Sequence, residues 1–126
     1  IDLKFKMDLI ENQLAAKELF VARYYASVQK WIPAINRYKM IVDKYEKTIF
    51  VEEALHRLVE IYYHLNFIKE AEKYASILGY NYNSSEWFKQ SYKILNKDYD
   101  LKANLDKKRK SRENNDFLKK IISLIK

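Results

Sequence analysis

The chain has 126 residues, with a single Gly, a single Pro and no Cys, and its formal net charge is +7. It lacks the residues that make tight hairpins and is rich in helix formers, so we expect an all-α protein. The absence of Cys excludes disulfides, thiolate metal sites and a thiol nucleophile. No apolar run approaches the roughly 18 residues of a membrane-spanning helix.

The positive charge is concentrated at the C-terminal end of the chain. Residues 1–100 hold 15 Lys and Arg against 14 Asp and Glu, whereas residues 101–126 hold nine against three. The body is therefore nearly neutral, and any attraction to an anionic partner belongs to the tail.

The first predicted hairpin covers about residues 8–45. Asp8 and Glu11 have the spacing of a capping box, which predicts that a helix begins there. This helix should run to about residue 30. One apolar stripe at helical spacing is formed by Leu14, Val21, Tyr25 and Val28, with the small Ala15 and Ala22 beside it.

Pro33 marks the start of the second helix, because its missing N–H would have no partner in a first turn anyway. We expect this helix to end near residue 44, before a turn in which Thr48 caps the next helix. Its inward side should be formed by Ala34, Ile35, Tyr38, Ile41 and Val42.

A second hairpin, about residues 50–79, repeats the first at a constant offset of 37 residues, so that Tyr25 corresponds to Tyr62 and Ala34 to Ala71. Gly79 is expected to end it as a left-handed cap. Its inward side should be formed by Leu55, Leu58, Val59, Tyr62, Leu65, Ala71, Tyr74, Ala75 and Leu78. Such units bury their apolar faces by stacking on one another.

A capping helix of about residues 85–99, begun by Ser84 or Ser85 and ending near Tyr99, should close the stack. We therefore predict one domain over residues 1–99, built as a tetratricopeptide-like α-hairpin solenoid of two repeats plus this closing helix. The tyrosines fall on the inward sides, which favours packing over a stacking platform for nucleic acid.

Residues 100–126 form a basic tail with a short amphipathic helix. The basic run contains Lys107, Lys108, Arg109 and Lys110, and the apolar face contains Phe117, Leu118, Ile121, Ile122 and Ile125. The pattern fits either a helix that docks on a protein or one that lies on a membrane surface. A solvated linker is the plainer interpretation of the basic run, and a nucleic-acid patch is the alternative.

Few residues are candidates for catalysis or metal binding. His56 and His64 are eight residues apart, not the four that would place two ligands on one metal, so we interpret them as ordinary, partly exposed side chains. Glu52, Glu53 and Glu60 fit a solvated helix face. We predict no catalytic, metal-binding or cofactor-binding residue and no cofactor.

Binding residues are expected on the outer face of the second helix. Arg37 is the main candidate, because Arg is enriched at binding hot spots through its planar set of donors. The alternative interpretation is an ordinary solvated arginine on a helix. Asn36 and Arg23 are its predicted companions in partner binding.

The 37-residue offset resembles the tetratricopeptide repeat, with signature positions at Ala22, Tyr25, Ala34, Tyr38, Leu55, Tyr62 and Ala71. Glu18 stands where that repeat usually has a bulky apolar residue. Over about residues 8–96 the amino-acid sequence is similar to the C-terminal half of the BamD family of outer-membrane assembly lipoproteins. The segments that carry this resemblance are LAAKE from Leu14, VARYY from Val21, AINR from Ala34, VEEAL from Val51, LGYNY from Leu78 and SEW from Ser85.

The resemblance implies a periplasmic scaffold at the outer membrane, held by a lipid anchor outside this sequence. It implies BamA as partner, through a POTRA domain near Arg37, and further lipoproteins of the same assembly machinery; unfolded outer-membrane proteins would bind the N-terminal half. Nucleic acid is not an expected partner. Two alternatives stay open: another periplasmic repeat scaffold, for envelope division or secretion, and an adaptor that binds anionic partners or nucleic acid through the basic tail.

Overall fold

The computed structural model describes residues 2–125, with side chains at 2–96 and 105–124. Five helices follow one another: α1 (Leu3–Ser27), α2 (Trp31–Lys44), α3 (Val51–His64), α4 (Ile68–Asn81) and α5 (Glu86–Ile125). The described residues form no strand, so the predicted all-α fold is confirmed. The chain divides into two compact units, Ile1–Ile94 and Leu95–Lys126. The side chains of Tyr99 and Ile125, both used in the sequence predictions, lie outside the described part.

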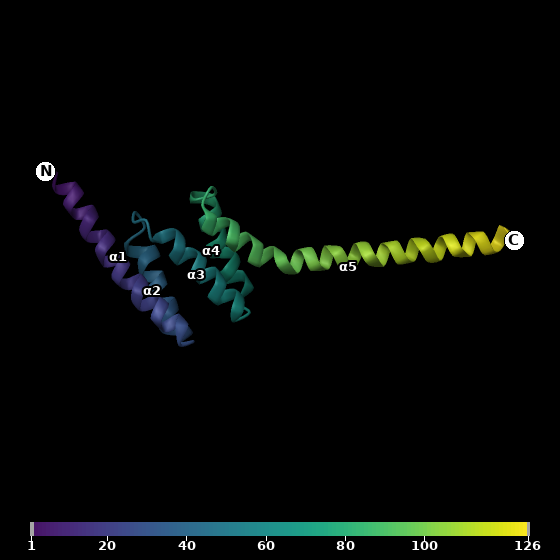
Figure 1. Cartoon of the computed structure of the whole chain (residues 1–126), viewed down its shortest axis with the longest axis horizontal. Helices are drawn as coiled ribbons and strands as arrows, with labels where there is room; N and C mark the ends of the chain where they lie inside the picture. Colours follow the sequence, from purple (N-terminus) through teal and green to yellow (C-terminus); the bar gives the residue numbers. More distant parts are fainter. Residues whose placement is uncertain (1, 126) are drawn as a thin grey trace. The chain divides into compact units, whose positions relative to one another are not determined.

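Within the first unit, α1 packs on α2, α2 on α3 and α3 on α4, as two successive helical hairpins (Figure 1). The bounds of α4 are those of α2 moved by 37 residues. The turns repeat as well: the Lys30 amide donates to the Tyr25 carbonyl at 2.9 Å, and the Phe67 amide donates to the Tyr62 carbonyl at 2.8 Å. The predicted tetratricopeptide-like repeat is confirmed in the backbone hydrogen bonds.

In α2, α3 and α4 the core of this unit consists largely of the residues predicted to face inward. Tyr38, Tyr62 and Tyr74 are all buried, and the rings of Tyr62 and Tyr74 stack at 5.7 Å with an interplanar angle of 4°. Ala34 and Ala71 are fully buried at the helix contacts, where their small side chains let the helices approach closely. The interpretation as packing residues is confirmed for these three tyrosines, whereas Tyr25 is half-buried.

Helix α1 begins earlier than predicted. Its N-cap is Asp2, whose Oδ1 accepts from the Lys4 amide at 3.2 Å, whereas Asp8 lies inside the helix. The carbonyl of Asp8 accepts from the Asn12 side chain at 3.0 Å. The prediction of a start at Asp8 was wrong, because nothing between the two aspartates breaks a helix and the earlier one supplies the same cap.

The stripe that α1 buries also differs from the predicted one. The buried residues are Ala15, Leu19 and Ala22, whereas Leu14 and Val28 are each 45% exposed. Leu14 is displaced by about 100° around the helix from Ala15, so the two belong to neighbouring stripes. Helix α2 packs on the stripe with the smaller side chains, which allows the closer approach. Periodicity alone could not choose between the two.

Two predicted caps were wrong. Thr48 does not cap α3, whose N-cap is Phe50; its hydroxyl instead donates to the Tyr45 carbonyl at 2.7 Å. Gly79 lies inside α4 with no positive φ, and a Cβ atom there would stand 2.6 Å from Cε2 of Phe88. This glycine therefore serves a close approach rather than a left-handed turn.

The cap expected at Ser84 or Ser85 is formed by Ser85, whose hydroxyl accepts from the Phe88 amide at 3.0 Å. The helix that begins there does not end near residue 99: the structure has one helix, Glu86–Ile125, where the sequence predicted two. No Pro or Gly occurs after Gly79 to end it. In the described part of the chain, no helix has both the length and the apolarity that crossing a membrane requires.

Candidate interaction site

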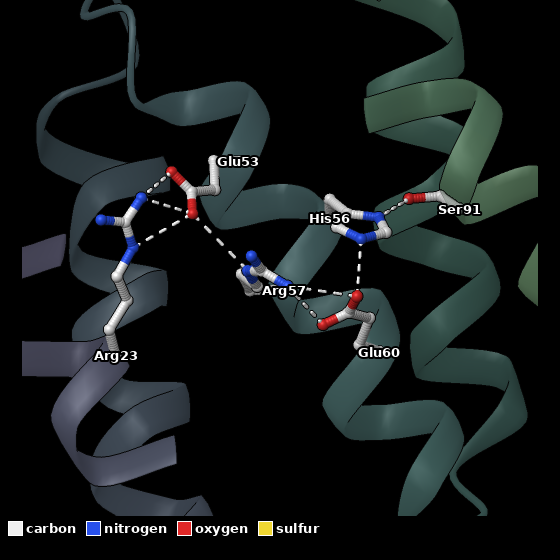
Figure 2. A network of polar contacts seen from close by, with 6 residues as sticks. All are labelled: Arg23, Glu53, His56, Arg57, Glu60 and Ser91. Atoms are coloured by element: carbon white, nitrogen blue, oxygen red, sulfur yellow. Dashed lines mark hydrogen bonds and ion pairs between the residues drawn. The ribbon is translucent and has the colours of Figure 1, made fainter. Parts of the chain in front are cut away.

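A buried carboxylate is the centre of the polar site in the first unit. Glu53 of α3 is 7% exposed, and Arg23 of α1 holds both of its oxygens (Figure 2). Nη2 of Arg23 lies 2.7 Å from Oε1 and 2.6 Å from Oε2, and Nε lies 3.1 Å from Oε1. A forked contact of this kind fixes the orientation of both groups as well as compensating the charge.

Arg57 connects this carboxylate to a second one. Its Nε is 3.6 Å from Oε1 of Glu53, and its Nη1 is 3.0 Å from Oε2 of Glu60 (Figure 2). Burial acts to raise the pKa of Glu60, but hydrogen bonds from His56 and Arg57 outweigh it and lower the pKa below its usual value. Glu60 is therefore held as a carboxylate within the network.

His56 extends the network to the first turns of α5. Its Nδ1 lies 2.7 Å from the Ser91 hydroxyl and its Nε2 lies 2.7 Å from Oε1 of Glu60. The ring is 1% exposed and packs at 5.2 Å from the Trp87 ring. The expectation of partly exposed histidines was wrong for His56, because its partners come from α5 and from the next turn of α3; His64 is exposed.

An open groove of about 430 Å³ lies beside the network, between α1, α2 and α3. The network residues Arg23, Arg57 and Glu60 line it together with Trp31, Tyr38, Ile61 and His64. Burial raises the pKa of Tyr38 to about 12; the nearby charge of Arg57 lowers it by a smaller amount, and that of Glu53 raises it. The groove thus combines aromatic rings with guanidinium groups that already form ion pairs within the network. This composition is typical of protein-binding hot spots.

Arg37 does not stand free on the outer face of α2. Its Nη1 donates to Oε2 of Glu18 at 2.8 Å, and the two side chains are 40% and 15% exposed. This hydrogen bond and the Glu18 charge raise the pKa of the guanidinium. Glu18 is the residue that replaces the usual bulky apolar side chain of the repeat, and the ion pair occupies that place. Asn36 is exposed next to Arg37.

The three predicted partner-binding residues do not form one patch. Arg37 pairs with Glu18 on α1, whereas Arg23, also on α1, pairs with Glu53 on α3. Five positions separate Glu18 from Arg23, which corresponds to about 140° around the helix. The two ion pairs therefore leave α1 on different sides, with Asn36 and Arg37 on one and Arg23 on the groove side.

The residues predicted for the tail lie in the second unit and are all exposed: Lys107, Lys108, Arg109, Lys110, Phe117 and Ile121. Arg109 forms an exposed ion pair with Glu113 at 3.5 Å, one turn further along α5. Among the residues described, no group of His, Asp and Glu side chains could hold a metal ion.

Sequence reasoning missed the buried half of the network. Glu53 was assigned with Glu52 and Glu60 to a solvated face, yet it is buried. One signal was available: Glu53 lies on the same side of α3 as His56 and Arg57, at spacings of three and four residues that place side chains next to each other on a helix. That spacing does not reveal a partner such as Arg23, which lies 30 residues away.

Comparison with known proteins places this chain in a family. Residues 1–77 match the model of the YfiO family, described as outer membrane lipoprotein. An outer membrane protein assembly factor BamD from Rickettsia prowazekii is 42% identical over 95 residues, which are 75% of this chain and 38% of the relative.

Two further relatives carry the same name. The protein from Caulobacter vibrioides is 35% identical over 75% of this chain and 31% of its own length, and that from Neisseria meningitidis serogroup B is 32% identical over 73% and 34%. The chain thus spans about a third of the length of the curated relatives it matches. The resemblance to the BamD family is confirmed: the chain belongs to the YfiO, or BamD, family of outer membrane lipoproteins.

Proposed function

We propose that this chain is a non-catalytic docking module in the assembly of outer-membrane β-barrel proteins, located at the periplasmic face of the outer membrane. The observation that carries the proposal is the match of the YfiO family model to residues 1–77, the part of the chain that folds into the two hairpins. The relatives bear the name of an outer membrane protein assembly factor. Stacked helical hairpins present side chains on rigid surfaces, which suits a scaffold.

The partner we propose is a POTRA domain of BamA, with further lipoproteins of the assembly machinery as secondary partners. The proposed contact surface is the side of α2 that carries Asn36 and Arg37. Asn36 is exposed, and Arg37 keeps donors beyond the one that contacts Glu18, because its guanidinium is 40% exposed. Glu18 fixes the direction of the guanidinium, which reduces the entropy lost when an acidic partner residue binds.

A binding experiment with matched variants tests this surface. The purified chain is titrated with the soluble POTRA domains of BamA from the same organism, and Arg37→Ala is compared with Glu18→Gln. Both changes remove the internal ion pair, but only the first removes the donors offered to the partner. We expect Arg37→Ala to weaken binding at least about tenfold, in the range of an interface hot spot. Glu18→Gln should retain most of the affinity.

Equal losses in the two variants, measured with unchanged helical circular dichroism, would show that the ion pair only supports the fold. Undiminished binding of Arg37→Ala would reject this surface for docking. Failure of the unmodified chain to bind any POTRA domain would favour another periplasmic repeat scaffold, for division or secretion, in which the same hairpins serve a different partner.

A further inference from the structure

The second half of α5 carries a surface that neither the repeats nor the proposed docking uses. Every described side chain from 105 to 124 is exposed. This segment contains seven Lys and Arg against three Asp and Glu, a net charge of +4. Its large apolar side chains are also exposed, with Phe117 at 64%, Ile122 at 56% and Leu124 at 85%.

The apolar side chains share one side of the helix. Phe117, Ile121 and Leu124 follow one another at spacings of four and three residues, which places them in a row. Leu118 and Ile122 widen that row into a face. At about 100° per residue, Lys119 and Lys120 lie on the opposite side.

The polar side chains between Phe117 and Leu124 lie on the other side of the helix and do not interrupt the apolar face. Ser123 donates its hydroxyl to the Lys120 carbonyl at 2.8 Å, so it brings no free donor to its surroundings. The preceding run from Lys107 to Lys110 supplies four consecutive positive charges, of which Arg109 is paired with Glu113 at 3.5 Å.

We propose that residues 105–125 of α5 form a membrane-surface helix that lies on anionic phospholipid, with the apolar face in the acyl boundary and the basic side chains among the headgroups. The combination of a short apolar face and a neighbouring basic run is what a peripheral helix needs, because each contribution alone gives only weak and reversible binding. Long Lys and Arg side chains can reach headgroups while their stems contact apolar surface.

Two other occupants fit the sequence less well. A second copy paired as a coiled coil would need an apolar seam over several heptads, but residues 106–116 contain no apolar side chain. A polyanion such as nucleic acid would use the basic run, but phosphate contacts give no role to Phe117, Ile121 and Leu124.

The test measures binding of the whole chain to lipid vesicles by co-sedimentation. We expect binding to vesicles of phosphatidylglycerol and phosphatidylethanolamine and at least about tenfold weaker binding to phosphatidylcholine vesicles. Phe117→Ser/Ile121→Ser should weaken binding at least about tenfold by removing apolar burial. Replacing Lys107, Lys108, Arg109 and Lys110 by Gln should produce a loss of similar size.

Control variants in the first unit test whether vesicle binding depends on this surface rather than on nonspecific adsorption of the chain. Ile49→Ser removes an apolar side chain that is 78% exposed, and Lys44→Gln/Lys47→Gln removes two surface charges; both variants should leave vesicle binding unchanged. A Phe117→Trp variant provides a fluorescence shift on contact with lipid that does not depend on sedimentation.

Three results would overturn the proposal. The first is no binding to anionic vesicles. The second is salt-sensitive binding that Phe117→Ser/Ile121→Ser leaves intact and that single-stranded DNA competes away, which would identify a plain polyanion site. The third is a dimer in solution that the same double variant dissociates. None of these outcomes depends on BamA, so they are independent of the docking proposed for α2.

Discussion

Gln29 and Asn66, 37 residues apart, adopt the same left-handed backbone conformation, with φ of 59° and 65°. Each follows the first helix of its hairpin and reverses the chain into the second helix. Asn tolerates this conformation because its short polar side chain bonds locally, whereas Gln gains less from it. The two turns therefore have the same backbone geometry, but the left-handed conformation is less favourable for Gln29 than for Asn66.

Gln29→Gly should stabilise the protein. Glycine has no Cβ to oppose a positive φ, and we expect a gain of about 0.5–1 kcal/mol in the free energy of unfolding. Asn66→Gly should increase the free energy of unfolding by less, because asparagine already tolerates this conformation. Chemical denaturation measures both, with Gln13→Gly inside α1 as the control, which should lose about 1 kcal/mol. A loss of stability in Gln29→Gly would contradict the left-handed turn.

The Arg23 contact compensates the buried carboxylate of Glu53. Arg23→Ala should cost about 1–3 kcal/mol, because it leaves a buried charge with only the more distant Arg57. Arg23→Ala/Glu53→Gln should recover part of that loss, since the remaining buried group is then neutral. Urea unfolding of the single and double variants gives the coupling energy.

The control for this cycle is Lys89→Ala. Lys89 pairs with Glu86 at 3.7 Å, and the two side chains are 61% and 70% exposed, so the loss should be close to zero. If Arg23→Ala costs no more than this control, the network does not support the fold.

Tyr38 should make the protein sensitive to alkali. Its pKa is raised to about 12 in the fold, whereas an unfolded tyrosine ionises near 10. The unfolded state therefore releases its proton first, and this stabilising contribution, complete below about pH 10, is lost as the pH rises to about 12. The loss should amount to roughly 2–3 kcal/mol for this one group.

Urea unfolding of Tyr38→Phe and the unmodified chain from neutral to alkaline pH measures this contribution. Phenylalanine cannot ionise, so the free energy of unfolding of the variant should increase relative to that of the unmodified chain as the pH rises. Tyr80→Phe is the matched control, because Tyr80 is 92% exposed and its difference from the unmodified chain should stay constant. A constant difference for Tyr38→Phe as well would contradict the burial of this hydroxyl.

Gly79 should tolerate a methyl group only when Phe88 is shortened. Its Cβ would stand 2.6 Å from Cε2 of Phe88, so Gly79→Ala should cost about 1–3 kcal/mol, despite the helix preference of alanine. In a Phe88→Leu background the same change should instead stabilise by up to about 1 kcal/mol. Thermal and urea unfolding of the four proteins in this cycle would reveal the sign change; the same sign in both backgrounds would contradict the close approach.

The amino-acid sequence alone determined the repeat. The 37-residue offset fixed which residues correspond. Of the residues predicted to face inward on α2, α3 and α4, all but Val42 and Leu65 are buried, because the apolar side chains of these helices recur at the helix period. The family resemblance also came mostly from residues within these hairpins. The docking role of Asn36 and Arg37 and the binding role of the tail stay predictions, to be decided by the binding experiments described above.

Only the tertiary structure decided which of two neighbouring stripes α1 buries, since both satisfy the helical period and only the approach of α2 selects the smaller one. It also decided that Glu53 and His56 are buried, because their partners Arg23 and Ser91 lie 30 and 35 residues away. For the same reason Arg37, expected to be free, is paired with Glu18. Spacing along a helix reports neighbours on that helix, whereas the burial of a charge depends on what another helix places against it.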